Sequence, residues 1–308
     1  MDDKVIITCA LTGGMTVPAQ SPAIPVTVDQ IVREGVRAAE AGASILHLHV
    51  REEATGKPVA DLELFDRLLS ELKKETDAVL QPTTGGGRGM TIEERGSVLK
   101  FRPEMGTFNA GSFNFGIFPV AARDLPFADW ERDYLEGTRD YIFKNTFADM
   151  EYMAALMKDS NTRPEIEVYD VGQLFNLKQL IKDGHLEAPF NIQFVLGVLG
   201  ANGGEPDQLI HMLRTAERLF GQDSFTWSAA GVGYPNEFNL AALSLMLGGN
   251  IRVGIEDNLR VRRTEVAKSN ADLVTKAVEL AALFDRSPAS PAEARTRLGL
   301  KGNEHVGF

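Results

Sequence analysis

Two histidines two residues apart are the first feature of this sequence that points to chemistry. His47 and His49 lie in the segment 44–51, S-I-L-H-L-H-V-R, whose branched and apolar residues predict a short strand. Side chains alternate across a strand, so both imidazoles should point to the same side. Together they can supply two nitrogen ligands to one zinc ion. The alternative is that both are core or rim histidines hydrogen-bonded to the backbone.

A second polar group occurs near the end of the chain, in the segment 248–258, G-G-N-I-R-V-G-I-E-D-N. Alternation along a strand would place Arg252, Gly254 and Glu256 on one face, toward the interior. Glu256 could then be the third zinc ligand, leaving one position open as in catalytic rather than structural sites. Asp257 would lie beside the metal-bound group, placed to take or give a proton.

Arg252 has two interpretations, and the sequence leaves both open. Its guanidinium could fix the carboxylate of a substrate or hold Asp257 ionised. It could equally form an interior ion pair with Glu256 or Asp257 and take no part in catalysis.

The elements that must position these residues alternate between strand and helix along the chain. Strands are expected at 4–11, 44–51, 78–81, 104–110, 166–169, 190–196, 225–229 and 251–255. Helices are expected at 28–41, 61–76, 91–100, 129–141, 145–158, 172–182, 206–220, 235–247, 266–284 and 292–298, with Thr27 and Thr91 as N-caps.

Eight strand–helix units predict an α/β chain folded as a (β/α)8 TIM barrel. We expect a single domain over residues 1–308, with an irregular insertion after strand four at 111–127 and a C-terminal tail at 287–308. The competing architecture is an open doubly wound sheet. It is disfavoured because no G-x-G-x-x-G follows the first strand.

In a TIM barrel the active site lies at the carboxyl ends of the strands, where this sequence places further polar residues. Thr83 follows the third strand, and Thr107 and Asn109 lie in the fourth. The glycines 85–87 expose backbone N–H groups that could hold a carboxylate or phosphate, although a triglycine can also be a plain tight turn. The aromatic segment 108–118 is expected to serve in loop packing or a subunit interface.

Composition limits the possible partners. The 308 residues are 44% hydrophobic and 24% charged, typical of a soluble globular protein, and no apolar stretch approaches a membrane span. A net charge of −11 argues against nucleic acid and anionic membranes as partners, but it does not exclude a local basic site for a polyanionic ligand. The single cysteine, Cys9, and the absence of a visible signal peptide predict a cytoplasmic protein.

Several blocks together resemble the beta-keto acid cleavage enzyme family, whose named member cleaves 3-keto-5-aminohexanoate. The blocks are I-T-C-A-L-T-G-G near the start, H-L-H-V-R at 47–51, P-T-T-G-G-G at 82–87, P-E-M-G-T-F-N-A-G-S at 103–112, E-I-E-V-Y-D at 165–170, and the 248–258 segment. The resemblance extends over residues 6–300.

The resemblance implies a zinc-dependent TIM barrel, usually a homotetramer. The implied reaction converts a β-keto acid and acetyl-CoA into acetoacetate and a new acyl-CoA. Carried over by position, the zinc ligands are His47, His49 and Glu256, Asp257 is the base with Arg252 as its neighbour, and Thr83, Gly86 and Thr107 line the substrate.

Met15 departs from the family pattern. The named member has a glutamate here, which binds the amino group of its substrate. Methionine offers a cationic amine no partner, and burying that amine unpaired would be costly. We therefore expect a neutral or less polar β-keto acid.

Two other functions remain open at this stage. The first is a different metal-dependent barrel, either a hydrolase or a zinc aldolase acting on a small carboxylate. The second is a metal-free barrel that serves as a binding or assembly protein. Metal content separates the latter from both enzymes, and dependence of turnover on acetyl-CoA separates the cleavage enzyme from the hydrolase.

Overall fold

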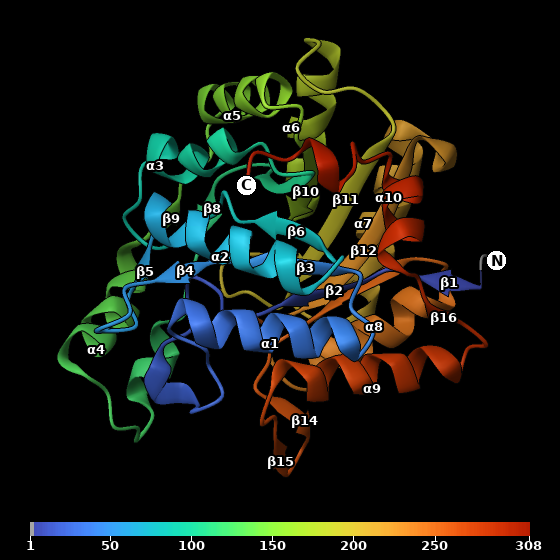
Figure 1. The fold of residues 1–308 in the computed structure, drawn as a ribbon. Helices are drawn as coiled ribbons and strands as arrows, with labels where there is room; N and C mark the ends of the chain where they lie inside the picture. The colour runs from blue at the N-terminus through green and yellow to red at the C-terminus, as the bar shows by residue number, and fades with distance from the viewer. Residues whose placement is uncertain (1–2) are drawn as a thin grey trace.

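The computed structural model describes residues 3–308 and contains one eight-stranded parallel sheet ringed by helices (Figure 1). The strands of this sheet are β2 (Ile7–Ala10), β3 (Ile45–Leu48), β6 (Val79–Pro82), β7 (Met105–Asn109), β10 (Arg163–Val168), β11 (Phe190–Leu196), β12 (Phe225–Gly231) and β13 (Asn250–Val253). All eight predicted strands are therefore confirmed, with ends that differ by a few residues.

The strand order identifies a barrel. Hydrogen-bonded neighbours follow the order β6-β3-β2-β13-β12-β11-β10-β7, so the first and last strands in sequence are adjacent. The remaining junction, between β6 and β7, is bridged beyond the ladder. The Thr84 N–H donates to Thr107 Oγ1 at 3.0 Å, and the Thr84 hydroxyl donates to the Thr107 carbonyl. The sheet is thus nearly closed, which confirms the predicted TIM barrel and excludes the open doubly wound sheet.

Helices cover the outside of the sheet, mostly as predicted. They are α1 (Val28–Glu40), α2 (Leu62–Glu75), α3 (Ile92–Gly96), α4 (Asp129–Glu136), α5 (Phe147–Asp159), α6 (Val171–Lys182), α7 (Pro206–Phe220), α8 (Asn236–Met246), α9 (Asn270–Ala282) and α10 (Pro291–Leu298). Both predicted caps are confirmed, since the hydroxyls of Thr27 and Thr91 accept from N–H groups in the first turns of α1 and α3. Within residues 3–308, no helix is both long and apolar enough to cross a membrane.

The segment before α9 differs from the prediction. A helix was expected from residue 266, but α9 begins at Asn270, where the Ser269 side chain accepts from the Asp272 N–H. The preceding residues form a hairpin of β14 (Arg260–Arg262) and β15 (Glu265–Val266). The helical spacing of apolar residues did not reveal this hairpin, because Val261 and Val266 fit either pattern.

The C-terminal tail closes the amino-terminal end of the barrel. Strand β16 (Ser287–Pro288) pairs with β1 (Lys4–Val5), and α10 follows it, on the same side of the molecule in Figure 1. Ala294 and Leu298 of α10 pack in one buried cluster with barrel residues, namely Ile6, Ile45, Val79 and Met105. The apolar plug at this end leaves the carboxyl ends of the strands free for polar residues.

The insertion after β7 contains short elements of its own. Strand β8 (Phe113–Asn114) pairs with β9 (Ile142–Phe143), and a 3-10 helix covers Phe118–Ala122. Phe113 stacks on Tyr169, which follows β10, with ring centroids 4.4 Å apart. A smaller hairpin, β4 (Val50–Arg51) with β5 (Pro58–Val59), follows β3. Both additions lie at the carboxyl ends of barrel strands.

The bridge between β6 and β7 generates a stability prediction. Thr107→Val keeps the side-chain shape but leaves the buried Thr84 N–H without its acceptor. We expect the free energy of unfolding to fall by about 1–3 kcal/mol. Denaturant unfolding measures this, with Thr264→Val on the exposed hairpin turn as the control that should change stability little. Equal stability of the two variants would show that the bridge does not hold this junction.

Candidate metal and catalytic site

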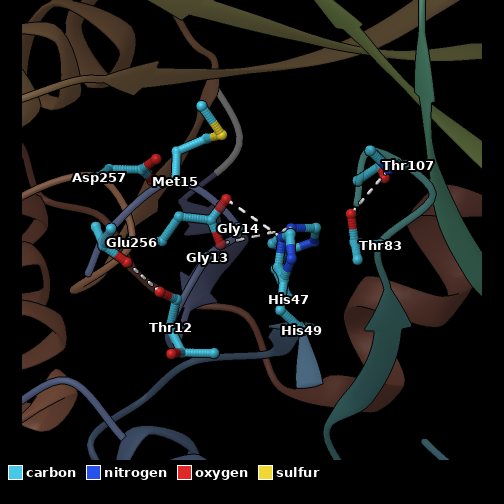
Figure 2. Close-up of polar contacts among 12 residues, drawn as sticks. Thr12, Gly13, Gly14, Met15, His47, His49, Thr83, Thr107, Glu256 and Asp257 are labelled. Carbon is cyan, nitrogen blue, oxygen red and sulfur yellow. Dashed lines mark hydrogen bonds and ion pairs between the residues drawn. The ribbon is translucent and has the colours of Figure 1, made fainter. Parts of the chain in front are cut away.

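His47, His49 and Glu256 converge inside the barrel as the sequence predicted. The two imidazole Nε2 atoms lie 3.2 Å apart. Glu256 Oε2 lies 3.6 Å from Nε2 of His47, and Oε1 lies 3.6 Å from Nε2 of His49. Figure 2 shows the carboxylate pointing at both rings. One ligand atom from each residue falls within 4.8 Å of the others, so the three can surround a single ion.

Close backbone approach makes this convergence possible. The loop after β2 passes directly over Glu256, and Gly13 adopts φ +71° there. A Cβ on Gly13 would lie 2.5 Å from Glu256 Cγ, so any side chain would push the carboxylate away. The loop is held by the buried Arg51, whose guanidinium donates to Thr12 Oγ1 and to the carbonyls of Thr12 and Gly13.

A turn after β13 brings two consecutive carboxylates into the site. Strict strand alternation would place Glu256 inside and Asp257 outside. Instead β13 ends at Val253, and Gly254 with φ +143° begins a turn in which the Asp257 N–H donates to the Gly254 carbonyl. Both carboxylates consequently reach Arg252. Buried Glu237 on α8 accepts from the Gly254 N–H at 2.9 Å and braces this turn.

Arg252 uses all of its N–H groups on protein acceptors. It makes two bonds to Asp257, at 2.8 and 2.9 Å, and one to Glu256 at 2.9 Å. Its remaining nitrogen donates to Glu167 and Gln193, both at 3.1 Å. The interior ion pair considered above is therefore present, and no guanidinium N–H is left for a substrate carboxylate.

Burial and charge set the protonation of the cluster. Burial lowers the pKa of His47 to about 3, so its imidazole is neutral and can act as a ligand. Burial opposes ionisation of Glu256, but Arg252 and the histidines outweigh it and hold its pKa well below its usual range. Burial raises the pKa of Asp257, with Arg252 opposing part of that rise. Burial also raises the pKa of Glu167 to about 8.

The donor set fits a divalent cation. Gln81 donates its amide to Glu165 at 2.8 Å, so its oxygen accepts the Nδ1 proton of His47 at 3.0 Å. The His47 Nε2 lone pair is then directed at His49 and Glu256. Glu256 Oε2 is buried and has no hydrogen-bond partner among residues 3–308. A lone pair and an unpartnered carboxylate oxygen facing each other are an arrangement that a cation stabilises.

A cavity of about 540 Å³ opens above the cluster. Of the residues predicted to bind substrate, Met15, Thr83, Gly86 and Asn109 line it, and both amide atoms of Asn109 are buried without a partner in the described chain. Thr107 does not line the cavity, because its hydroxyl is turned to Thr84. Its assignment to substrate contact stays a prediction that the geometry does not support.

The insertion contributes more to the cavity than predicted. The aromatic segment 108–118 was expected to serve in loop packing or a subunit interface, and Phe113 does pack against Tyr169. Phe115 and Ile117 also line the cavity, together with Val120, Tyr141 and Phe143. The mixture of glycine, proline and aromatic residues indicates an irregular connection, but the direction in which such a connection folds depends on tertiary contacts.

Four supporting residues were missed by the sequence analysis: Gln81, Glu165, Arg51 and Glu237. All are buried, and their contacts reach residues far away in sequence. A polar residue inside an apolar strand, as Gln81 is in V-L-Q-P, was the available signal. Arg51 was visible as the last residue of H-L-H-V-R, but its partners were not.

Comparison with known proteins agrees with this site. The sequence matches the beta-keto acid cleavage enzyme family over residues 4–300. The chain belongs to this family. The resemblance inferred from the separate sequence blocks is thereby confirmed over nearly the whole chain.

Curated members of the family are similar over their full length. The chain is 44% identical to the 3,5-dioxohexanoate:acetyl-CoA acetone transferase of Paraburkholderia graminis, covering 99% of this chain and 98% of that protein. It is 37% identical to the 3-keto-5-aminohexanoate cleavage enzyme of Acetoanaerobium sticklandii, covering 97% and 99%. Identity to the 3-oxoadipate:acetyl-CoA acetyltransferase of Cupriavidus necator is 33%, covering 99% and 98%.

Solved structures support the fold. The apo structure of ObcA superposes with a TM-score of 0.74 at 20% identity, covering 91% of this chain and 66% of that one. At 20% identity this similarity supports the fold only. The barrel fold agrees with the strand order found in this beta-keto acid cleavage enzyme.

The Gln81 contact leads to a prediction about metal affinity. Gln81→Leu removes the acceptor that orients His47, and we expect zinc affinity to weaken about 10- to 100-fold. Competition against a chromophoric chelator measures the affinity. Gln179→Leu is the matched control, because that exposed glutamine on α6 contacts Asp183 far from the site. Equal zinc affinity of both variants would contradict the assigned role.

Proposed function

We propose that this beta-keto acid cleavage enzyme converts acetyl-CoA and a β-keto acid with an uncharged side chain into acetoacetate and a new acyl-CoA, with zinc bound by His47, His49 and Glu256. The observation that carries the proposal is the adjacency of this ligand set to the Arg252–Asp257 pair at the floor of one cavity. The printed names of the Paraburkholderia and Cupriavidus relatives, which include acetyl-CoA, support the thioester.

Bound zinc would act as a Lewis acid toward the keto and carboxylate oxygens of the substrate. Its charge would make the methylene group between them more acidic. The chain's own residues do the rest. Asp257 shares a cavity wall with the ligand set and is held by two hydrogen bonds from Arg252, so its carboxylate has a fixed position. We assign Asp257 as the base that removes the methylene proton and Arg252 as the residue that positions it.

The remaining steps exchange two acyl groups. The carbanion formed at the methylene carbon attacks the acetyl thioester carbonyl, and CoA thiolate leaves. The thiolate then attacks the original keto carbonyl, the bond from that carbon to the methylene carbon breaks, and an acyl-CoA forms. The departing carbanion of acetoacetate takes a proton back from Asp257. No cysteine is required, in keeping with the burial of Cys9.

The cavity lining around Met15 supports a substrate that is uncharged beyond its carboxylate. Met15 lines the cavity and packs in one cluster with Ile117 and Val120, which line it as well. The unpartnered amide of Asn109 can serve a neutral polar group such as a second ketone. The Paraburkholderia relative is named for 3,5-dioxohexanoate, which carries such a group, and the Acetoanaerobium relative for an amino-keto acid.

The oligomeric state and the cellular location are also proposals. We propose a homotetramer, as the family resemblance implies, located in the cytoplasm. Exposed apolar side chains at the ends of α8 and α9, Met246 at 56% and Leu283 at 79% exposure, support a subunit contact. Sedimentation of the purified protein tests the state, and a monomer would contradict it.

Turnover of a β-keto acid panel tests the function. We expect 3,5-dioxohexanoate to be consumed only when acetyl-CoA is present, with acetoacetate appearing in equal amount. Asp257→Asn should keep its zinc and lose about 10²- to 10⁴-fold in kcat, since the proton acceptor is gone. Glu256→Gln should lose zinc as well as activity, because it removes a ligand.

Two outcomes would contradict this assignment. Equal consumption of keto acid without the thioester would indicate a hydrolase or an aldolase. If Glu256→Gln and His47→Ala both retain the zinc content of the wild type, the metal does not bind at the proposed site.

Met15 provides a specificity test. Met15→Glu places a carboxylate at the cavity wall, where it can pair with an amine. We expect kcat/KM for 3-keto-5-aminohexanoate to rise and that for 3,5-dioxohexanoate to fall, each about tenfold. Met15→Gln is the uncharged control of the same size. If Met15→Glu and Met15→Gln change the two kcat/KM values by the same factors, charge at position 15 does not select the substrate.

A further inference from the structure

Three exposed arginines line the mouth of the catalytic cavity. Arg260 and Arg263 lie on the β14–β15 hairpin, and Arg123 follows the 3-10 helix of the insertion. The chain as a whole carries a net charge of −11. The three arginines therefore form a positively charged region on an otherwise acidic protein. Clustered charge at the entrance of a cleft creates a strong local potential whatever the net charge of the protein.

These arginines are not neutralised by nearby carboxylates. The acidic residues that line the cavity are Glu167, Glu256 and Asp257, and all three are bound to Arg252 at its floor. Among the residues described, neither Arg263 nor Arg260 forms an ion pair, and the guanidinium of Arg260 donates only to the Arg263 carbonyl. The mouth therefore offers guanidinium groups that an anionic ligand can use.

The neighbouring Arg262 shows the contrast within the same hairpin. Its guanidinium lies 3.6 Å from Glu265, its side chain is 73% exposed, and it does not line the cavity. Regular alternation would place Arg260 and Arg262 on one face, but the register of the hairpin shifts between these two residues. Arg260 and Arg263 line the cavity, and Arg262 does not.

The hairpin is braced directly to the catalytic turn. Asn258, next to Asp257, accepts from the Arg260 N–H at 3.0 Å and donates to the Arg260 carbonyl at 2.6 Å. The same amide donates to Glu237 at 2.9 Å. The position of Arg260 relative to the catalytic carboxylates is thus set by short, partly buried bonds.

Apolar side chains accompany the arginines at the opening. Leu199 and Tyr234 line the cavity yet are 50% and 37% exposed. Exposed apolar surface at a cavity entrance is typical of a site that receives part of a ligand. Guanidinium groups and apolar surface beside one another match a ligand with phosphates and an uncharged arm.

We propose that Arg260 and Arg263, assisted by Arg123, bind the phosphate groups of the CoA thioester while its uncharged arm enters the cavity past Leu199 and Tyr234. The inference rests on the proposed function, which supplies the thioester. Arginine suits the role because its planar donor fork pairs with two phosphate oxygens at once. The site would select the nucleotide part of the cosubstrate, separately from the keto acid.

The double variant R260A/R263A tests the proposal against acetyl-pantetheine, a thioester without the nucleotide phosphates. We expect kcat/KM for acetyl-CoA to fall about 10- to 100-fold, and that for acetyl-pantetheine to fall at least tenfold less. The wild-type KM for acetyl-CoA should rise with ionic strength, and that of the variant, which keeps only Arg123, should rise less steeply. Arg262→Ala is the matched control on the same hairpin and should behave as wild type.

Calorimetric titration with free CoA and with pantetheine separates failure of this proposal from failure of the proposed function. If the wild type turns over acetyl-CoA and R260A/R263A affects both thioesters equally, the phosphate site is wrong and the function stands. If the wild type turns over neither thioester, the function is wrong. Tighter CoA binding by wild type than by R260A/R263A would then still support the arginine site, and equal binding would overturn it.

Discussion

The catalytic end of this barrel depends on a single buried guanidinium. Arg252 joins Glu167 from β10, Gln193 from β11 and the two carboxylates of the turn after β13. Removing one member of such a buried group leaves an uncompensated charge, which costs about 3–5 kcal/mol. The same bonds decide where the Glu256 carboxylate points, so the position of the candidate metal site and that of the candidate base are set by one side chain.

The barrel separates stability from chemistry along its axis. At the amino-terminal end, α10 and barrel residues form a dry apolar plug. Toward the other end the interior becomes polar, with Gln81, Glu165 and Gln193 buried and hydrogen-bonded. These three side chains are tolerated there because each is hydrogen-bonded. The interior layer that holds the histidines can therefore be rigid without being apolar.

Elements added to the barrel form much of the cavity lining. The insertion after β7 supplies apolar cavity walls, and the hairpin after β13 supplies arginines at the mouth. Both follow strand ends, and the second is braced through Asn258 to the turn that carries Glu256 and Asp257. The curated relatives carry different keto acids in their names.

The sequence by itself determined the strand–helix alternation, the barrel, and the shared direction of His47 and His49, because apolar periodicity and strand alternation are local properties. Glu256 meets the two histidines as expected, but it does so from the turn after β13 rather than from the strand. The sequence also placed Asp257 beside the metal-bound group, but only the tertiary structure showed the turn that carries both carboxylates inward, where the positive φ of Gly254 breaks the alternation. Gln81, Arg51 and Glu237 act through partners far away in sequence, and Thr107 faces Thr84 rather than the cavity. Such contacts depend on the closure of the ring of strands, which no local pattern encodes.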